Sequence, residues 1–249
     1  MNHFFMKKQL VLVFCVLVLN FLGVKTVFAQ TTQVEDAENL SLENAKRIFI
    51  TAVKEQSRLF NGPTYYTYGS GVDGSAIFLD TTFIKGTIFY EGIKYNEVPL
   101  MYDLYIDKLV SVVAGSAYSL ISEKVSEFEI ANHHFRYLNF ENSANKAPFE
   151  PGFFEVLYDG KIRVIAKHNE KLGFSTKLDI PYYFKPKTVY LLEKDNHFYK
   201  FSDDGSLINL LDKNKKEMKK LLQEASVRFK DDPIKVILLI AKYHDSLAN

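Results

Sequence analysis

The sequence predicts an α+β fold, a curved antiparallel β-meander of about ten strands with a helix before it and helices after it. Three observations predict this fold. Between residues 76 and 201, apolar runs alternate with turn-forming residues at a spacing of roughly 8–12, without a helical period between them. The chain has 15 tyrosines and 21 phenylalanines, which favour strands. From residue 206 onward, apolar residues recur at helical spacing.

The N-terminal residues 1–29 are typical of a cleavable signal peptide. Two lysines precede an apolar run over 10–24, and Val27 and Ala29 occupy positions −3 and −1 of the expected cut before Gln30. The run is shorter than the ~20 residues that a bilayer span requires. We therefore expect an exported protein, in the periplasm, associated with the outer membrane or secreted, without a transmembrane segment after cleavage. An uncleaved N-terminal anchor is the alternative.

Cysteine and charge limit the chemistry. Cys15 is the single cysteine and lies inside the apolar run, so cleavage leaves no thiol for disulfides, nucleophiles or metal ligands. The bulky Phe14 before it disfavours lipid attachment at Cys15. Cleavage also changes the balance from 31 basic and 30 acidic residues to 28 and 30, a net charge of about −2. The chain as a whole therefore has no electrostatic drive towards nucleic acid or anionic membrane.

The remaining chain reads as one domain over 41–249, after a polar, flexible lead over 30–40. Ser41 is a good N-cap for a helix over 41–60, which Asn61-Gly62-Pro63 should end. The sheet follows over 76–201. Its alternating patterns include residues 100–107, which read as one half-buried strand. Asp159-Gly160 gives the strongest two-residue hairpin signal, and Glu91-Gly92 and Asp195-Asn196 give weaker ones.

The C-terminal residues 206–247 are predicted to be helical. Asn214 with Glu217 resembles a capping box, and Asp232-Pro233 should open the last helix, with an acid at the N-cap and proline at N1. The lysines between 213 and 220 suit either a solvated helix face or contact with anionic lipid head groups. Interspersed acids favour the solvated face.

No motif signals catalysis, a metal or a cofactor. Gly69–Gly74 matches G-x-G-x-x-G, but residues 76–79 after it look like a strand where a dinucleotide site needs a helix. His133 and His134 are adjacent, so a strand would point them to opposite faces and away from a shared metal. We expect no catalytic residue, no metal site and no cofactor, and we favour a protein that is not an enzyme.

Tyrosines are the candidate ligand-binding residues, because they offer apolar area with a polar tip. Three flank a glycine-rich loop and three lie in or beside the predicted strands. The candidates are Tyr65, Tyr66, Tyr68, Tyr102, Tyr105 and Tyr118.

The stretches 86–95, 100–104 and 152–158, together with the helical tail, resemble uncharacterised exported β-rich proteins of Gram-negative bacteria. This resemblance implies no activity. The leading hypothesis is a non-catalytic exported envelope protein that binds a partner or ligand, which could be an envelope protein, a glycan or a lipid. One alternative is an apolar-ligand (lipid) carrier with a half-barrel sheet. A second is a carbohydrate-active hydrolase that uses carboxylates on the sheet loops, and a third is a structural module that docks onto an outer-membrane assembly.

Overall fold

The computed structural model describes residues 40–41, 44, 47, 58–80, 82–144, 149–176, 179–212 and 214–247. The predicted signal peptide, nearly all of the predicted lead and most of the predicted helix over 41–60 lie outside these residues. The chain divides into two compact units, residues 1–56 and 57–249. All elements below belong to the second unit, beginning with the short 3-10 turn η1 (Arg58–Phe60).

The second unit has the predicted α+β fold, with one curved, open sheet of eleven strands in the order β1-β10-β9-β8-β7-β6-β2-β3-β4-β5 and with β11 also paired to β10. The strands are β1 (Val72–Asp73), β2 (Ile84–Tyr90), β3 (Ile93–Asp103), β4 (Lys108–Val113), β5 (Ser116–Ser119), β6 (Val125–Ile130), β7 (His133–Leu138), β8 (Gly152–Asp159), β9 (Arg163–Phe174), β10 (Tyr182–Lys194) and β11 (His197–Phe201).

Two antiparallel meanders make up the sheet. Strands β2 to β5 form one and β6 to β11 form the other, and the pairing of β2 with β6 joins them. The short β1 pairs in parallel with the start of β10. Two further 3-10 turns, η2 (Phe78–Asp80) and η3 (Ser122–Lys124), lie in the connections before β2 and before β6.

Tight turns occur where the sequence predicts them. Tyr90 pairs with Ile93 and Lys194 pairs with His197, which leaves two-residue loops at Glu91-Gly92 and Asp195-Asn196. All four loop residues have positive φ, as the hairpin turn with the right twist requires. The turn predicted at Asp159-Gly160 is displaced by one residue. Asp159 still belongs to β8 and pairs with Arg163, so the loop consists of the three residues 160–162.

The predicted strand over 100–107 is wrong in its second half, because β3 ends at Asp103. The Asp103 carboxylate accepts hydrogen bonds from the backbone N–H groups of Tyr105 and Ile106 at 2.9 and 3.3 Å. This side-chain turn competes with strand extension, and Asp107 completes the reversal with a φ of 53°.

The sheet curls around an aromatic core. Four strand spacings of ~4.8 Å separate β3 from β8 along the sheet. The Tyr102 ring of β3 nevertheless lies 5.8 Å from the Phe153 ring of β8 and 5.2 Å from the Phe135 ring of β7. These contacts require strong curvature, and the rings fill the concave side between the two meanders.

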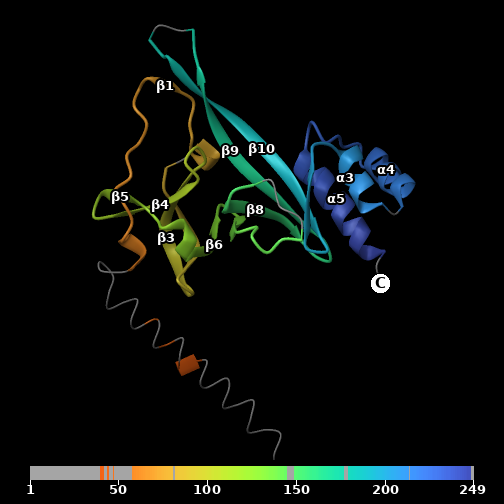
Figure 1. Ribbon diagram of the computed structural model, residues 1–249, viewed down its shortest axis with the longest axis horizontal. Coiled ribbons are helices and arrows are strands. Elements are labelled where there is room, and N and C mark those ends of the chain that lie inside the picture. The colour runs from red at the N-terminus through yellow and green to blue at the C-terminus, as the bar shows by residue number, and fades with distance from the viewer. Residues whose placement is uncertain are drawn as a thin grey trace, which may run out of the picture. The chain divides into compact units, whose positions relative to one another are not determined.

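The C-terminal helices are α3 (Asp204–Leu211), α4 (Lys215–Glu224) and α5 (Pro233–Ser246). Their apolar residues pack with Val164 of β9 and Leu192 of β10, at the opposite end of the β9–β10 hairpin from β1 (Figure 1). The predicted start of α5 is confirmed, since the Asp232 side chain caps the helix and Pro233 follows it. None of the helices within the described residues is long and apolar enough to cross a membrane.

Candidate functional site

Asp103 gathers two of the predicted tyrosines. It is buried at the end of β3, and the hydroxyls of Tyr65 and Tyr68 each donate a hydrogen bond of 2.8 Å to its Oδ2. Its Oδ1 accepts the two backbone N–H groups of the turn. Burial, followed by the hydrogen bond to this carboxylate, raises the pKa of both tyrosine hydroxyls. The hydroxyls therefore stay protonated, and Asp103 anchors the glycine-rich segment to the sheet.

A third predicted tyrosine joins this cluster from the β3–β4 turn. The Tyr105 ring lies 5.8 Å from the Tyr68 ring, and both contact Phe184 of β10, at 5.5 and 4.9 Å. Tyr105 is 42% exposed, whereas Phe184 is buried. Tyr68, Tyr105 and Phe184 thus form an aromatic cluster that is partly exposed at Tyr105 and that includes one residue of the β9–β10 hairpin.

The other three predicted tyrosines lie apart from this cluster. Tyr66 is 81% exposed, and Tyr118 is half-buried on β5. Tyr102 lies in the aromatic core, where its hydroxyl donates a 2.5 Å hydrogen bond to Asp107. Of the six predicted tyrosines, Tyr65, Tyr68 and Tyr105 therefore gather around Asp103 and Phe184, and the other three do not join them.

The β9–β10 hairpin carries exposed apolar side chains that the sequence analysis did not single out. They gather on its outer half, next to the described ends of the two strands: Leu172, Phe174, Tyr182 and Tyr183. Phe174 is 84% exposed, and its ring lies 5.5 Å from that of Tyr182. Residues 168–171 are all polar, and only Leu172 and Phe174 are apolar beyond them, so the sequence signal for this extension is weak.

Cross-strand pairing assigns the hairpin residues to two faces, because directly opposite residues project to the same side. Phe174 lies opposite Tyr182, and Leu172 lies opposite Phe184, which gives one face an apolar surface. Lys171 lies opposite Lys185 on the other face. The outer half of the hairpin is therefore amphipathic.

Glu170 lies at the inner limit of this outer half. Its Oε2 is buried and has no hydrogen-bond partner among the described residues, and burial raises the pKa of its carboxyl. Its backbone N–H donates a 3.4 Å hydrogen bond to the Leu104 carbonyl, which attaches the β3–β4 turn to the edge of β9. The hairpin is thus supported at its base, and its outer part extends beyond that contact.

The buried carboxylate of Glu155 contacts two histidines, one of which belongs to the adjacent pair His133 and His134 of the sequence analysis. His133 Nδ1 and His168 Nε2 lie 2.5 and 2.6 Å from the two oxygens of Glu155, whereas His134 contacts Glu127 instead. The prediction that His133 and His134 point to opposite faces is consistent with these separate partners. Within the described part of the chain, no group of three or more His, Cys, Asp or Glu side chains could hold a metal ion.

Glu155 is held as an anion by its partners. Its burial would raise the pKa of the carboxyl, but the hydrogen bonds from His168 and His133 outweigh burial and keep this pKa below its usual range. Phe78 packs against both imidazole rings, with centroid distances of 5.0 and 5.5 Å. Both carboxylate oxygens therefore already have partners within the fold.

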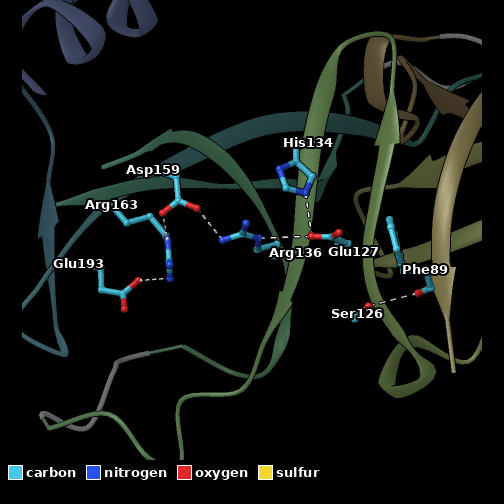
Figure 2. A network of polar contacts seen from close by, with 8 residues as sticks. All are labelled: Phe89, Ser126, Glu127, His134, Arg136, Asp159, Arg163 and Glu193. Carbon is cyan, nitrogen blue, oxygen red and sulfur yellow. Dashed lines mark hydrogen bonds and ion pairs between the residues drawn. The ribbon is translucent and has the colours of Figure 1, made fainter. Parts of the chain in front are cut away.

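A ladder of alternating charges crosses five neighbouring strands (Figure 2). Arg163 contacts Glu193 and Asp159, each at 2.8 Å, and Arg136 contacts Asp159 at 2.8 Å and Glu127 at 3.4 Å. These side chains are about one-third exposed, and each charge faces opposite charges on adjacent strands. The ladder has two guanidinium groups and three carboxylates, each already in contact with an opposite charge, and it favours the observed strand register.

The C-terminal helices border an open groove of about 790 Å³, to which the start of α3, the end of α4 and residues 226–230 contribute. Asp203 at its rim caps α3, and the backbone N–H of Ser206 lowers the pKa of the Asp203 carboxyl. Arg228 contacts Asp231 at 2.6 Å. The predicted capping box at Asn214 is absent, because its left-handed backbone leaves the side chain without a cap hydrogen bond.

Comparison of the chain with family models, curated proteins and solved structures finds no match. The resemblance to exported β-rich proteins of Gram-negative bacteria therefore stays a prediction.

Proposed function

We propose that this chain is an exported, non-catalytic envelope protein that binds its partner through the outer half of the β9–β10 hairpin. The observation that carries the proposal is the clustering of exposed apolar side chains there. Four of the large apolar side chains that are exposed among the described residues lie on this hairpin, and Tyr105 borders it. Contiguous exposed apolar surface of this kind is typical of an interaction site.

The buried carboxylates support binding over catalysis. Asp103 accepts hydrogen bonds from two tyrosine hydroxyls and two backbone N–H groups, and Glu155 contacts two imidazoles. A general acid or base must be free to exchange a proton with a substrate. The hydrogen-bonding capacity of both groups is largely used by the fold, which favours the binding protein over the carbohydrate-active hydrolase.

The packing of the sheet interior favours the binding protein over the lipid carrier. A carrier with a half-barrel sheet needs an apolar cavity on the concave side. Tyr102, Phe128 and Phe135 are buried there with ring centroids 4.7–5.4 Å apart. The partner therefore binds on the outside of the hairpin.

The test compares three forms of the exported protein as bait for separate protein, glycan and lipid fractions of the envelope. One form is the wild type, one carries Leu172→Ser with Phe174→Ser, and the control carries Tyr199→Ser, which removes an exposed ring on β11, outside the hairpin. We expect the hairpin variant alone to lose its bound component while keeping the wild-type circular dichroism spectrum. Equal retention by all three forms would contradict the proposal.

A further inference from the structure

Lys167 is a buried lysine whose amine contacts a carboxylate from a distant part of the chain. Its side chain, on β9, is 9% exposed, and its Nζ lies 2.6 Å from Oδ2 of Asp107 in the β3–β4 turn. Nζ also donates a 2.9 Å hydrogen bond to the Phe153 carbonyl and lies 5.0 Å from the centre of the Phe154 ring. The amine is therefore held in one position inside the fold, against the carboxyl group.

The two oxygens of the Asp107 carboxyl group have different partners. Tyr102 donates a 2.5 Å hydrogen bond to Oδ1, whereas Lys167 contacts Oδ2. Burial, followed by the charge of Asp107, raises the pKa of the buried Tyr102 hydroxyl, so this hydroxyl stays protonated. The carboxyl group thus has a neutral hydrogen-bond donor at one oxygen and an amine at the other.

A glycine allows the amine and the carboxyl group to approach each other. Gly152 begins β8, and a Cβ atom there would collide with Oδ2 of Asp107 and would lie 2.9 Å from Nζ of Lys167. Any side chain at this position would therefore push the two groups apart or displace the start of the strand.

The surroundings disfavour the charged form of the lysine. Burial lowers the pKa of the Lys167 amine, and the neighbouring Asp107 opposes this effect only in part. A desolvated lysine loses its proton more readily, and the neutral amine is a nucleophile. A covalent bond between the two groups would remove both charges and with them the free-energy cost of keeping an ion pair out of water.

From this geometry we propose that Lys167 and Asp107 become joined by an intramolecular isopeptide bond, a modification that goes beyond the proposed binding function and does not depend on it. One proton passes from the ammonium group to Oδ2, which leaves an amine beside a carboxylic acid. Nζ then attacks Cγ, while the Tyr102 hydroxyl stabilises the negative charge that develops on Oδ1. A second proton passes from Nζ to Oδ2, the Cγ–Oδ2 bond breaks, and one water molecule leaves.

The reaction needs no partner outside the chain. Contact between the reacting groups supplies the proximity that an enzyme otherwise provides for its substrate. Each chain reacts once and ends as an amide, so the modification is compatible with a protein that is not an enzyme.

The bond would connect the two meanders of the sheet. Asp107 lies in a turn of the first meander and Lys167 lies on β9 of the second, whereas the pairing of β2 with β6 joins the meanders within the sheet. A covalent link closes a loop over residues 107–167 and restrains the unfolded chain, as a disulfide does. The chain that signal cleavage is predicted to leave has no cysteine, so it depends on other chemistry for a cross-link.

Mass spectrometry of the exported protein tests the proposal. The wild type, kept folded overnight after purification, should be lighter than its sequence mass by one water molecule. A proteolytic digest should contain one branched peptide that joins the segments around Asp107 and Lys167. In the same digest, Lys85 and Glu97 are the internal control, because they form an exposed ion pair at 2.9 Å and should yield no branched peptide.

Lys167→Arg is the matched variant, because it keeps the positive charge but replaces the nucleophilic amine with a guanidinium group. We expect this protein to keep its full sequence mass and to migrate more slowly than the wild type in a denaturing gel, since its loop is open. Cyclisation of an N-terminal glutamine would change both masses equally, so the comparison between the two proteins isolates the link.

Tyr102→Phe tests the part played by the hydroxyl, because it keeps the ring in the aromatic core and removes the donor to Oδ1. Loss of one such donor slows acyl transfer by about 10²–10³-fold. We therefore expect the linked form to appear at least about tenfold more slowly in newly made Tyr102→Phe protein than in the wild type. An unchanged rate would overturn the role assigned to Tyr102.

Two results would overturn the isopeptide bond itself. A full sequence mass for the folded wild type, with no branched peptide, would show that Lys167 and Asp107 form only an ion pair. A loss of water that persists in Lys167→Arg would show that the water comes from another site. Neither result changes the retention of a partner by the hairpin, so the binding proposal stands or falls separately.

Discussion

His168 of β9 lies with its Nε2 2.6 Å from Oε2 of Glu155 on β8, and its Nδ1 lies 3.2 Å from the Thr188 hydroxyl of β10. The imidazole therefore connects three neighbouring strands through side-chain contacts. His133 of β7 contacts the other oxygen of Glu155 and extends the connection to a fourth strand. A single buried carboxylate thus links strands β7 to β10 at the edge of the aromatic core.

Replacing Glu155 tests this link. Glu155→Gln removes the charge that both imidazoles contact, and we expect the free energy of unfolding at pH 7 to fall by about 1.5–3 kcal/mol, the range for hydrogen bonds to a charged group. Urea unfolding followed by circular dichroism measures the change. Glu129→Gln, at an exposed site on β6, is the control and should cost less than about 0.5 kcal/mol.

The stabilities of the wild type and of Glu155→Gln should also depend differently on pH. The pKa of Glu155 is lower in the folded chain than its usual value of 4.5, so the ionised carboxyl stabilises the fold above that pH. This contribution is lost as the pH falls through the folded-state pKa. The difference in unfolding free energy between the wild type and Glu155→Gln should therefore shrink as the pH falls below about 4.5. A difference that stays constant to pH 3 would contradict the assigned ionisation.

Asp103 should be the most sensitive polar position near the candidate site. Asp103→Ala leaves four donors without an acceptor, and we expect a loss of about 3–5 kcal/mol. Tyr65→Phe and Tyr68→Phe each remove one hydrogen bond and should cost about 1–2 kcal/mol. Because the partners are shared, Asp103→Ala should cost less in the Tyr65→Phe background than in the wild type. Strictly additive costs in urea unfolding would show that this hydrogen bond does not contribute.

Turns and helix ends could be predicted from the sequence where residues close together in the chain determine them. The turns at Glu91-Gly92 and Asp195-Asn196 need only residues that accept positive φ, and the start of α5 needs only Asp232 and Pro233. The α+β class followed from the same local patterns. The end of β3 was missed because the side chain of Asp103 binds the next backbone N–H groups, and hydrophobic alternation does not reveal that competition.

The candidate site required pairings that alternation does not determine. Asp103 meets Tyr65 and Tyr68 across 38 and 35 residues, and Glu155 meets His133 across 22. Hydrophobic alternation predicts which face of the sheet a residue occupies. Which strand lies next to it depends on how the two meanders join, and alternation does not show that. The pairing of β2 with β6, which curls the sheet, has no local signal.

The extension of the hairpin was hidden by Pro186, which normally argues against a strand interior. Pro186 pairs with Glu170 of β9 on one side. On the outer edge of β10, β1 pairs only at Tyr182 and Tyr183, and β11 pairs only from Tyr190 onward. The proline occupies the free interval between these two pairings, so its missing N–H costs no hydrogen bond in the ladder.

The charge ladder of Figure 2 should contribute far less to stability than the buried carboxylates. Arg136 and Asp159 are 32% and 36% exposed, and exposed ion pairs contribute about 0.2–1 kcal/mol. We expect Arg136→Ala to lower the unfolding free energy by at most about 1 kcal/mol at low salt, and by less in 1 M sodium chloride, where screening is strong. Lys85→Ala, which breaks a pair that is 73% exposed on both sides, is the control with no measurable effect. A larger, salt-independent loss at Arg136 would indicate that its packing, and not its charge, stabilises the sheet.

The junction between the two meanders depends on a residue without a side chain. Gly86 of β2 faces β6, and a Cβ atom there would lie 2.3 Å from the Glu129 carbonyl oxygen and 2.9 Å from Ile130 Cγ2. The backbone oxygen cannot move aside without opening the β2–β6 pairing, so Gly86→Ala should destabilise the unit by about 2–3 kcal/mol or more. Gly69→Ala is the matched control, because no atom lies within 4 Å of the added methyl group. Hydrogen exchange should show faster exchange in β2 and β6 of the Gly86→Ala protein. Unchanged protection in both strands would mean that the junction tolerates a wider spacing and that the curl of the sheet does not depend on this close approach.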